Sequence, residues 1–117
     1  MKKTINIFVS ILFLAVSATS LASGDAEAGQ AKSATCMACH GPKGIGIPSA
    51  KFPALSAQHA EYIASQLKAF RQYSINEQTG SDEVSRDNDY EGMMRNVAKG
   101  LTTVEIEALA EYIAGLH

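Results

Sequence analysis

Cysteine is scarce in this sequence of 117 residues, because Cys36 and Cys39 are the only two. A structural zinc site normally takes four ligands, and there is no second cysteine pair to complete one. No run of residues has the pattern of a β-strand, so the strand-and-helix setting of a thioredoxin-like dithiol is missing as well. A structural disulfide between the two cysteines would close a very small loop, where crosslinking stabilises least.

The chain also lacks an excess of positive charge. It has 10 basic and 12 acidic side chains, and without Lys2 and Lys3 the balance becomes 8 to 12, a net charge of −4. A nucleic-acid partner would favour a basic patch, so we expect none. No Ser, His and Asp arrangement suggests a nucleophilic catalyst, and we expect no enzyme. The charge suits a soluble carrier that electrostatics steers towards its partners.

The apolar run near the N-terminus, Ile7 to Val16, is interrupted only by Ser10 and follows two lysines. It is too short to span a bilayer comfortably, which takes about 20 residues. Small residues follow it, and Ser20-Leu21-Ala22 matches a cleavage site. We therefore predict a cleaved signal peptide at 1–22 and a single periplasmic domain at 23–117, the alternative being an uncleaved membrane anchor.

What the chain does contain is the run Cys36-Met37-Ala38-Cys39-His40, which reads C-x-x-C-H. This is the pattern for covalent attachment of a c-type haem. Two thiols three positions apart can each add to a haem vinyl group, and the adjacent imidazole of His40 can bind the iron as proximal ligand. In bacteria this attachment takes place outside the cytoplasm, in agreement with export. The motif predicts one covalent haem c; a dithiol redox pair is the alternative.

Three segments have the pattern of α-helices, namely 25–35, 58–73 and 102–117. The first is rich in alanine and runs directly into Cys36, and its Gly29 is either a close approach to another helix or a tolerated weak spot. The second places apolar residues at helical spacing, and its Arg71 either pairs with a haem propionate or is solvated. The class is all-α, with three main helices and long connections around one haem.

The last helix has the clearest signals. Thr102 and Glu105 have the capping-box form, in which each side chain bonds the other's free backbone N–H. Apolar residues then repeat at helical spacing to the C-terminus: Ile106, Leu109, Ile113 and Leu116. Tyr112 lies beside that stripe, and we expect it to pack on the first helix.

The connections carry two further predictions. In the Gly- and Pro-rich segment Gly41 to Ser56, the carbonyl of Pro48 is a candidate acceptor for the ring N–H of His40, or Pro48 only shapes a turn. The apolar residues of that segment could cover a haem face. Ser74 to Tyr90 is polar and acidic and predicts an exposed loop, with a short helical turn near 89–92.

The second axial ligand has four candidates beyond the motif: His59, Met93, Met94 and His117. His117 is at the frayed end of a helix, and His59 opens the middle helix, where an exposed histidine is commoner. The two methionines lie between the acidic segment and the last helix, in a stretch without strong regular structure. They could equally be hydrophobic fillers, the usual role of Met. Composition and spacing do not choose between these readings.

From Asp25 to His117 the chain resembles the class I c-type cytochromes, small soluble monohaem carriers of bacteria, and single domains of the dihaem kind. The matching parts are CMACHG, FPALSAQHAEYIASQLKAFR and MMRNVAKGLTTVEIEALAEYIAGL. The resemblance implies the cytochrome c fold, with the first and last helices paired so that Gly29 lies near Tyr112. The acidic segment Glu77 to Asp89 is where this chain is least similar to the family.

The resemblance also implies the site residues. Cys36 and Cys39 would be the thioether sites and His40 the proximal ligand. Related chains commonly place the ligand Met eight positions before the cap of the last helix, and counting back from Thr102 gives Met94. The implied function is a periplasmic electron carrier with His/Met ligation and transient docking to redox proteins, including membrane respiratory complexes. The alternatives are a haem c subunit of a larger oxidoreductase and a ligand-binding haem sensor.

Overall fold

The computed structural model describes residues 24–117, and the predicted signal peptide at 1–22 lies outside them. This part of the chain forms five α-helices: α1 (Ala26–Lys32), α2 (Ala34–His40), α3 (Ala60–Thr79), α4 (Met93–Ala98) and α5 (Thr103–Ala114). Three 3-10 turns lie in the connections: η1 (Pro42–Gly44), η2 (Pro48–Ala50) and η3 (Tyr90–Gly92). Within residues 24–117 the β pairing consists of one isolated bridge between Ile47 and Phe52, so the all-α class is confirmed.

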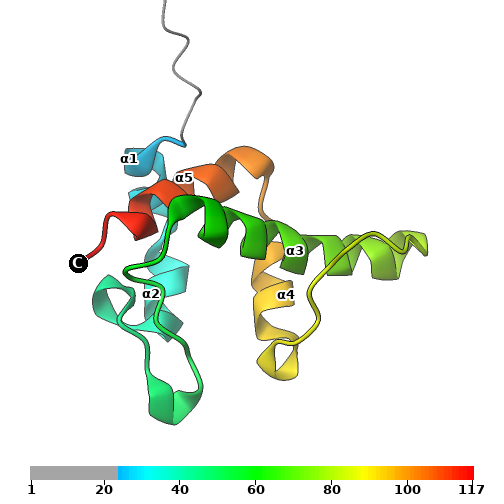
Figure 1. Ribbon diagram of the computed structural model, residues 1–117, viewed down its shortest axis with the longest axis horizontal. Helices are drawn as coiled ribbons and strands as arrows, with labels where there is room; N and C mark the ends of the chain where they lie inside the picture. Colours follow the sequence, from blue (N-terminus) through cyan, green and yellow to red (C-terminus); the bar gives the residue numbers. More distant parts are fainter. Residues whose placement is uncertain (1–23) are drawn as a thin grey trace, which may run out of the picture.

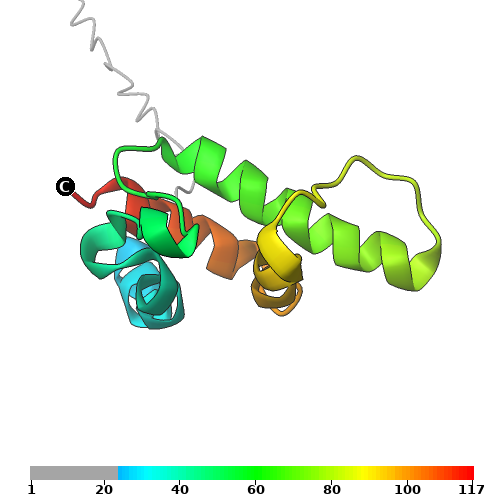
Figure 2. The same ribbon diagram turned by 90° about the horizontal axis from the view of Figure 1, so that it is seen from below.

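Helix α5 is at the centre of the fold. Figures 1 and 2 show it between α1 and α3, and both of these helices pack on it. Three of the four residues of its predicted apolar stripe are buried, because Ile106, Leu109 and Ile113 are each at most 2% exposed. The fourth, Leu116, is half-buried and lies beyond the end of the helix at Ala114. Ile63 and Leu67 of α3 complete this core. None of the helices formed by residues 24–117 combines the length and the apolar character that a bilayer crossing requires.

Helices α1 and α5 approach each other closely at Gly29. This glycine is buried, and a Cβ placed on it would overlap the backbone of Ala108 and crowd the Cβ of Tyr112. The reading of Gly29 as a close approach is therefore confirmed, as is its predicted neighbourhood with Tyr112. Asp25 caps α1, since its carboxylate accepts the N–H of Glu27 at 3.0 Å.

The first predicted helix is divided at Ser33, which separates α1 from α2. The buried hydroxyl of Ser33 donates to the carbonyl of Gln30 at 2.8 Å, in the manner of serines that compete with the helical backbone. Helix α2 starts immediately afterwards and contains the whole CMACH motif. The position of the motif is consequently tied to the α1–α5 packing.

The middle helix is longer than predicted. It ends at Thr79 rather than near Tyr73, so the prediction of loop for Ser74 onwards is wrong as far as Thr79. The helix ends at Gly80, which is left-handed with φ 70° and donates its N–H to the carbonyl of Asn76 at 2.8 Å. A glycine at this position is a helix stop signal that outweighs the polar composition before it. The predicted turn near 89–92 is confirmed as η3.

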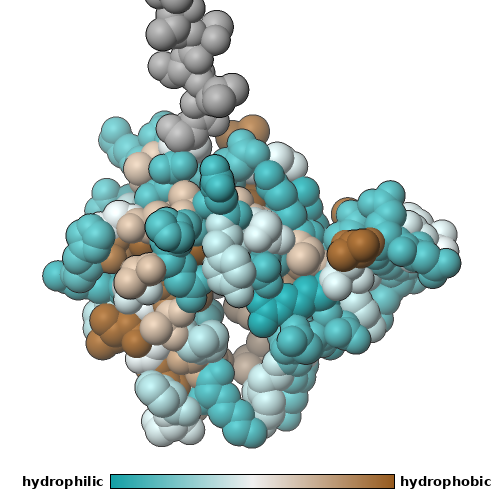
Figure 3. Space-filling model, in the orientation of Figure 1, coloured by the Kyte–Doolittle hydropathy of each residue, from teal (hydrophilic) through white to brown (hydrophobic). Residues whose placement is uncertain are grey.

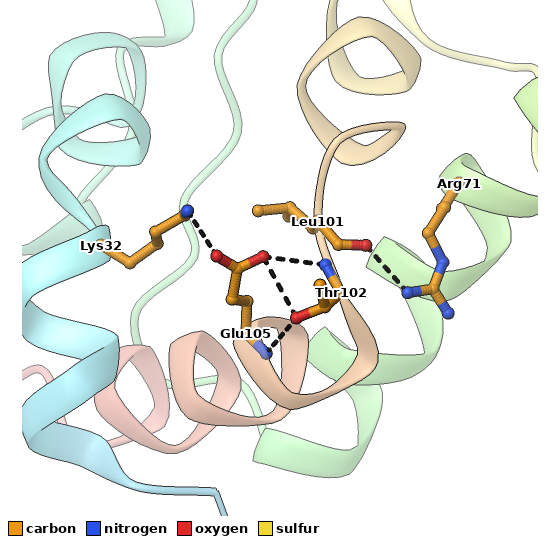
Figure 4. A network of polar contacts seen from close by, with 5 residues as sticks. All are labelled: Lys32, Arg71, Leu101, Thr102 and Glu105. Atoms are coloured by element: carbon orange, nitrogen blue, oxygen red, sulfur yellow. Dashed lines mark hydrogen bonds and ion pairs between the residues drawn. The ribbon is translucent and has the colours of Figure 1, made fainter.

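The capping box at the start of α5 is confirmed and is shared with a neighbouring helix (Figure 4). Glu105 accepts the backbone N–H of Thr102 at 2.8 Å with one oxygen and the ammonium of Lys32 at 2.5 Å with the other. Arg71 donates to the carbonyl of Leu101 at 2.9 Å, so it fixes the α4–α5 connection and is neither a cavity residue nor a freely solvated one.

Replacing Glu105 with glutamine is expected to lower stability at pH 7 and to have little effect near pH 2. The hydrogen bond from Lys32 and the bonds from Thr102 lower the pKa of Glu105 from 4.5 to about 2. Because the pKa is lower in the folded chain, this carboxylate stabilises the fold above about pH 4.5 and loses its effect as the pH falls towards about 2. Urea unfolding of both proteins from pH 7 to pH 2 measures the difference. Glutamine can still accept the Thr102 N–H, so the comparison tests the charge of Glu105. A difference in stability between the two proteins that stays constant with pH would contradict the prediction.

Candidate functional site

Helix α2 presents the three chemically active side chains of the motif at different depths. Cys36 is half-buried, Cys39 is exposed and His40 is 4% exposed. Burial raises the pKa of the Cys36 thiol, and the nearby Cys39 adds to this, while a backbone hydrogen bond opposes it. Dithiol redox sites lower the pKa of the attacking cysteine instead. The pKa of Cys36 is shifted in the opposite direction.

The imidazole of His40 is held by the carbonyl of Pro53, at 2.7 Å from Nδ1. A carbonyl oxygen can only accept, so Nδ1 carries the proton and Nε2 keeps a free lone pair for a metal. The assignment of this role to Pro48 is wrong. Pro48 begins η2, and its carbonyl accepts the N–H of Lys51 at 3.0 Å.

A cavity of about 480 Å³ opens beside this imidazole. Helix α2 and its following loop form one wall of the cavity, and η3 with α4 forms the other. Figures 1 and 2 show these two walls on opposite sides, both below α3 in the picture. Residues of α3 line it between the walls: Tyr62, Ile63, Gln66, Leu67 and Phe70. Figure 3 shows the surface hollowed between the two walls. The size lies within the range of cofactor and ligand pockets.

Met93 and Met94 both line the cavity from the wall opposite the motif, and both are half-buried. They start α4, so the prediction that they lack regular structure is wrong. Met94 also packs against the hydrophobic core. His59 and His117 are exposed and do not line the cavity. The cavity thus brings Cys36, Cys39, His40 and the methionine pair together and leaves out the other two candidates.

The loop after the motif contributes only part of its apolar residues. Phe52 and Leu55 line the cavity, and the centre of the Phe52 ring lies 6.2 Å from the centre of the His40 ring. Ile45 and Ile47 do not line it and are exposed. The expectation that this loop covers one face of a haem therefore applies to its second half.

The cavity wall carries two cations that have no carboxylate partner within 4 Å in the described chain, Lys51 and Arg86. The Arg86 guanidinium is bound by neutral groups, donating to Gln66 at 2.7 Å and to Asn88 at 2.6 Å, and it lies over the ring of Phe70. Lys51 lies 4.6 Å from the ring centre of Tyr90. These charges suit a bound group that carries carboxylates.

The acidic residue in the cavity wall, Asp89, is already paired. Its carboxylate accepts Nε of Arg95 at 2.7 Å, and the guanidinium lies over the ring of Tyr73. Burial lowers the pKa of Arg95, but the charge and hydrogen bond of Asp89 outweigh it and the pKa is raised. The sequence does not reveal the roles of Arg86, Asp89 and Arg95, because nothing in the composition of the acidic segment or of the following helix indicates which side chains turn inward.

Comparison with known proteins identifies the family of the chain. The family model described as cytochrome c matches residues 26–117. The chain is 46% identical over 83 residues to cytochrome c4 of Stutzerimonas stutzeri, which covers 70% of this chain and 34% of that protein. It is 35% identical over 89 residues to cytochrome c-554(548) of Halomonas halodenitrificans, covering 76% of this chain and 93% of that one.

A solved structure shares the fold. The crystal structure of reduced recombinant cytochrome c4 from Pseudomonas stutzeri superposes with a TM-score of 0.62 at 33% identity, over 82% of this chain and 53% of that one. Another relative, 38% identical over 81 residues, is the thiosulfate dehydrogenase electron acceptor of Stutzerimonas stutzeri strain A1501, covering 69% of this chain and 32% of that protein. The chain thus spans about a third of the cytochrome c4 sequence that it matches and about half of the solved chain.

Proposed function

The chain belongs to the cytochrome c family, and from that premise we propose that it is an electron carrier with one covalent haem c. Cys36 and Cys39 attach the haem through two thioethers. His40 and Met94 would supply the two protein ligands to its iron. Two protein ligands would leave no place on the iron for a small-molecule substrate, so the chain would act as a carrier rather than as an enzyme.

One observation carries this proposal: a single, largely apolar cavity has the CMACH motif on one wall and the methionine pair on the other. His40 offers Nε2 to the iron because Pro53 holds its other ring nitrogen. Met94 is preferred to Met93 because its packing against the core limits where its thioether can go. A His/Met pair favours a higher reduction potential than two histidines.

The other residues of the cavity hold the cofactor and exclude water. Haem bound here supplies an iron that cycles between Fe(II) and Fe(III) one electron at a time. Ile63, Leu67 and Phe70 present apolar surface to the ring. Arg86 and Lys51 would receive the two carboxylates of the haem, in place of Arg71.

The proposed location is the periplasm, reached by means of the signal peptide at 1–22. The net charge of −4 after cleavage allows electrostatic steering towards redox proteins, with small contacts that release quickly. A relative named as an electron acceptor of a dehydrogenase supports protein partners of this kind. Membrane respiratory complexes are the proposed partners on the other side of the exchange.

A second candidate is a haem c subunit of a larger oxidoreductase. It is favoured by the fact that the matched region makes up only about half of the solved cytochrome c4 chain, so in that protein the equivalent unit is joined to a further part. The present chain would then pass electrons within a stable complex. Co-purification with a catalytic subunit distinguishes this candidate from a free carrier.

The deciding experiment is optical spectroscopy on the full chain, expressed in a host that attaches haem c. We expect a pyridine haemochrome that shows covalent haem, a near-red Met-to-Fe(III) band in the oxidised protein, and a reversible one-electron wave in voltammetry. The reduced protein should not bind carbon monoxide at neutral pH. A product without covalent haem would overturn the proposal, whereas rapid carbon monoxide binding would favour the ligand sensor.

A further inference from the structure

A partly buried ionic cluster, in which the Arg95 side chain is 24% exposed, lies where the loop after α3 enters the methionine-bearing helix α4. The side chain of Asp89 is 4% exposed, and its two oxygens accept the Nε of Arg95 at 2.7 Å and the backbone N–H of Arg95 at 3.0 Å. The Arg95 guanidinium lies 4.4 Å from the ring centre of Tyr73, on α3. The Asp89–Arg95–Tyr73 cluster therefore connects the loop, the first turn of α4 and the long helix.

This cluster differs from the other ion pairs of residues 24–117 in its burial. In Lys32–Glu105 and Lys68–Glu107 every side chain is between 33% and 48% exposed, and exposed pairs of this kind contribute less to stability than a buried pair. A buried carboxylate is costly unless its partner and its hydrogen bonds are in place, so removing one member of the Asp89 pair has a large effect. The ion pair whose loss has the largest effect therefore lies at a polar connection between two helices.

Helix α4 needs external support at its first turn. It has only six residues, and its N-cap, Gly92, has no side chain to accept the free N–H groups. A helix this short is unstable by itself. Asp89 supplies the missing cap by accepting the N–H of Arg95, the third residue of the helix, and its negative charge is favoured at a helix start.

The residue held in this way directly follows Met94. We propose that the Asp89–Arg95–Tyr73 cluster positions the first turn of α4 so that the methionine thioether stays on the iron; this inference rests on the proposed function. The cluster is a positioning device and does not itself touch the iron. When it is lost, the first turn of α4 loosens while the α1–α3–α5 core remains, and the sixth position opens to other ligands.

The test uses the haem-loaded full chain with Asp89→Ala, Asp89→Asn and Arg95→Lys. For each variant, the near-red band is followed with temperature beside the far-ultraviolet helix signal, and carbon monoxide binding to the reduced protein is measured. Glu107→Gln is the matched control, because it breaks the exposed ion pair Lys68–Glu107 between α3 and α5, which includes no residue of α4. Asp89→Asn keeps an acceptor for the Arg95 N–H but removes the charge, so its effect should be smaller than that of Asp89→Ala.

We expect Asp89→Ala to raise the fraction of molecules that bind carbon monoxide by about tenfold to a hundredfold, and its band to disappear well below the temperature at which the helices melt. Asp89→Asn and Arg95→Lys show the same separation to a smaller degree, and they decide the question if Asp89→Ala does not fold. The inference is overturned if the band and the helix signal are lost together in every variant, or if Glu107→Gln behaves like Asp89→Ala. A wild-type protein with covalent haem but without the band would refute the Met ligation itself, and this inference with it.

Discussion

Replacement of Met94 by alanine is expected to remove the near-red Met-to-Fe(III) band and to let the reduced protein bind carbon monoxide. The methyl group of alanine has no atom that can bind iron, and it is too short to reach across the cavity. The reduction potential should fall, because the thioether favours Fe(II). Axial ligands set haem potentials over a range of roughly 0.8 V, so a shift of about 100 mV or more is expected. Protein-film voltammetry and visible spectroscopy measure these changes.

Met93→Ala is the matched control, since Met93 is the preceding residue of the same helix and lines the same cavity. It should keep the band and the resistance to carbon monoxide, with a modest loss of stability because a half-buried side chain is truncated. If Met93→Ala alone loses the band, the assignment of Met94 is wrong. If neither variant loses it, the sixth ligand is not a methionine of this pair.

The parts of the fold that sequence reasoning predicted correctly depend on local chemistry. Helix α5 is determined by the capping box of Thr102 and Glu105 and by the apolar stripe behind it. These signals lie within a few residues of each other in the chain. The CMACH motif is local in the same sense, and the structure places it on one helix. Gly29 is recognisable as an anomaly within a helical pattern, and the resemblance adds that it lies near Tyr112.

The failures concern interactions between residues that are distant in sequence or are set by loop geometry. Pro48 was a plausible partner for His40, but the bridge between Ile47 and Phe52 folds the loop back, and it is Pro53 whose carbonyl reaches the ring. No periodicity encodes such a loop. Arg71 likewise had no local signal for its contact with Leu101.

The acidic segment is the most instructive failure. Its charges suggested solvated surface, which holds for most of them, yet Arg86 and Asp89 turn towards the cavity. A charged residue is buried only with a partner, and the partner of Asp89 lies beyond a glycine turn, on the next helix. Composition averages over the segment and cannot separate the one paired carboxylate from its exposed neighbours.

Replacement of Gly29 by alanine is expected to destabilise the fold, although alanine is the better helix former. Helix propensity alone favours the change by about 1 kcal/mol. The new Cβ would overlap the backbone of Ala108, which no side-chain rotation relieves, and overpacking of this kind costs about 3 kcal/mol. The expected net loss is about 2 kcal/mol, which lowers the melting temperature by roughly 8 to 16 °C in a domain of this size.

Gly100→Ala provides the control, because a Cβ there meets nothing within 4 Å. It should change stability by less than about 0.5 kcal/mol. Calorimetry of the two variants and the wild type compares the melting temperatures. The Gly29 variant should also bind more carbon monoxide when reduced. Only Ser33 separates α1 from the helix that carries His40. Pushing α1 away from α5 therefore moves one wall of the cavity relative to the other. An unchanged melting temperature in Gly29→Ala would mean that the two helices can separate at little cost, and that the α1–α5 packing does not determine the position of the CMACH motif.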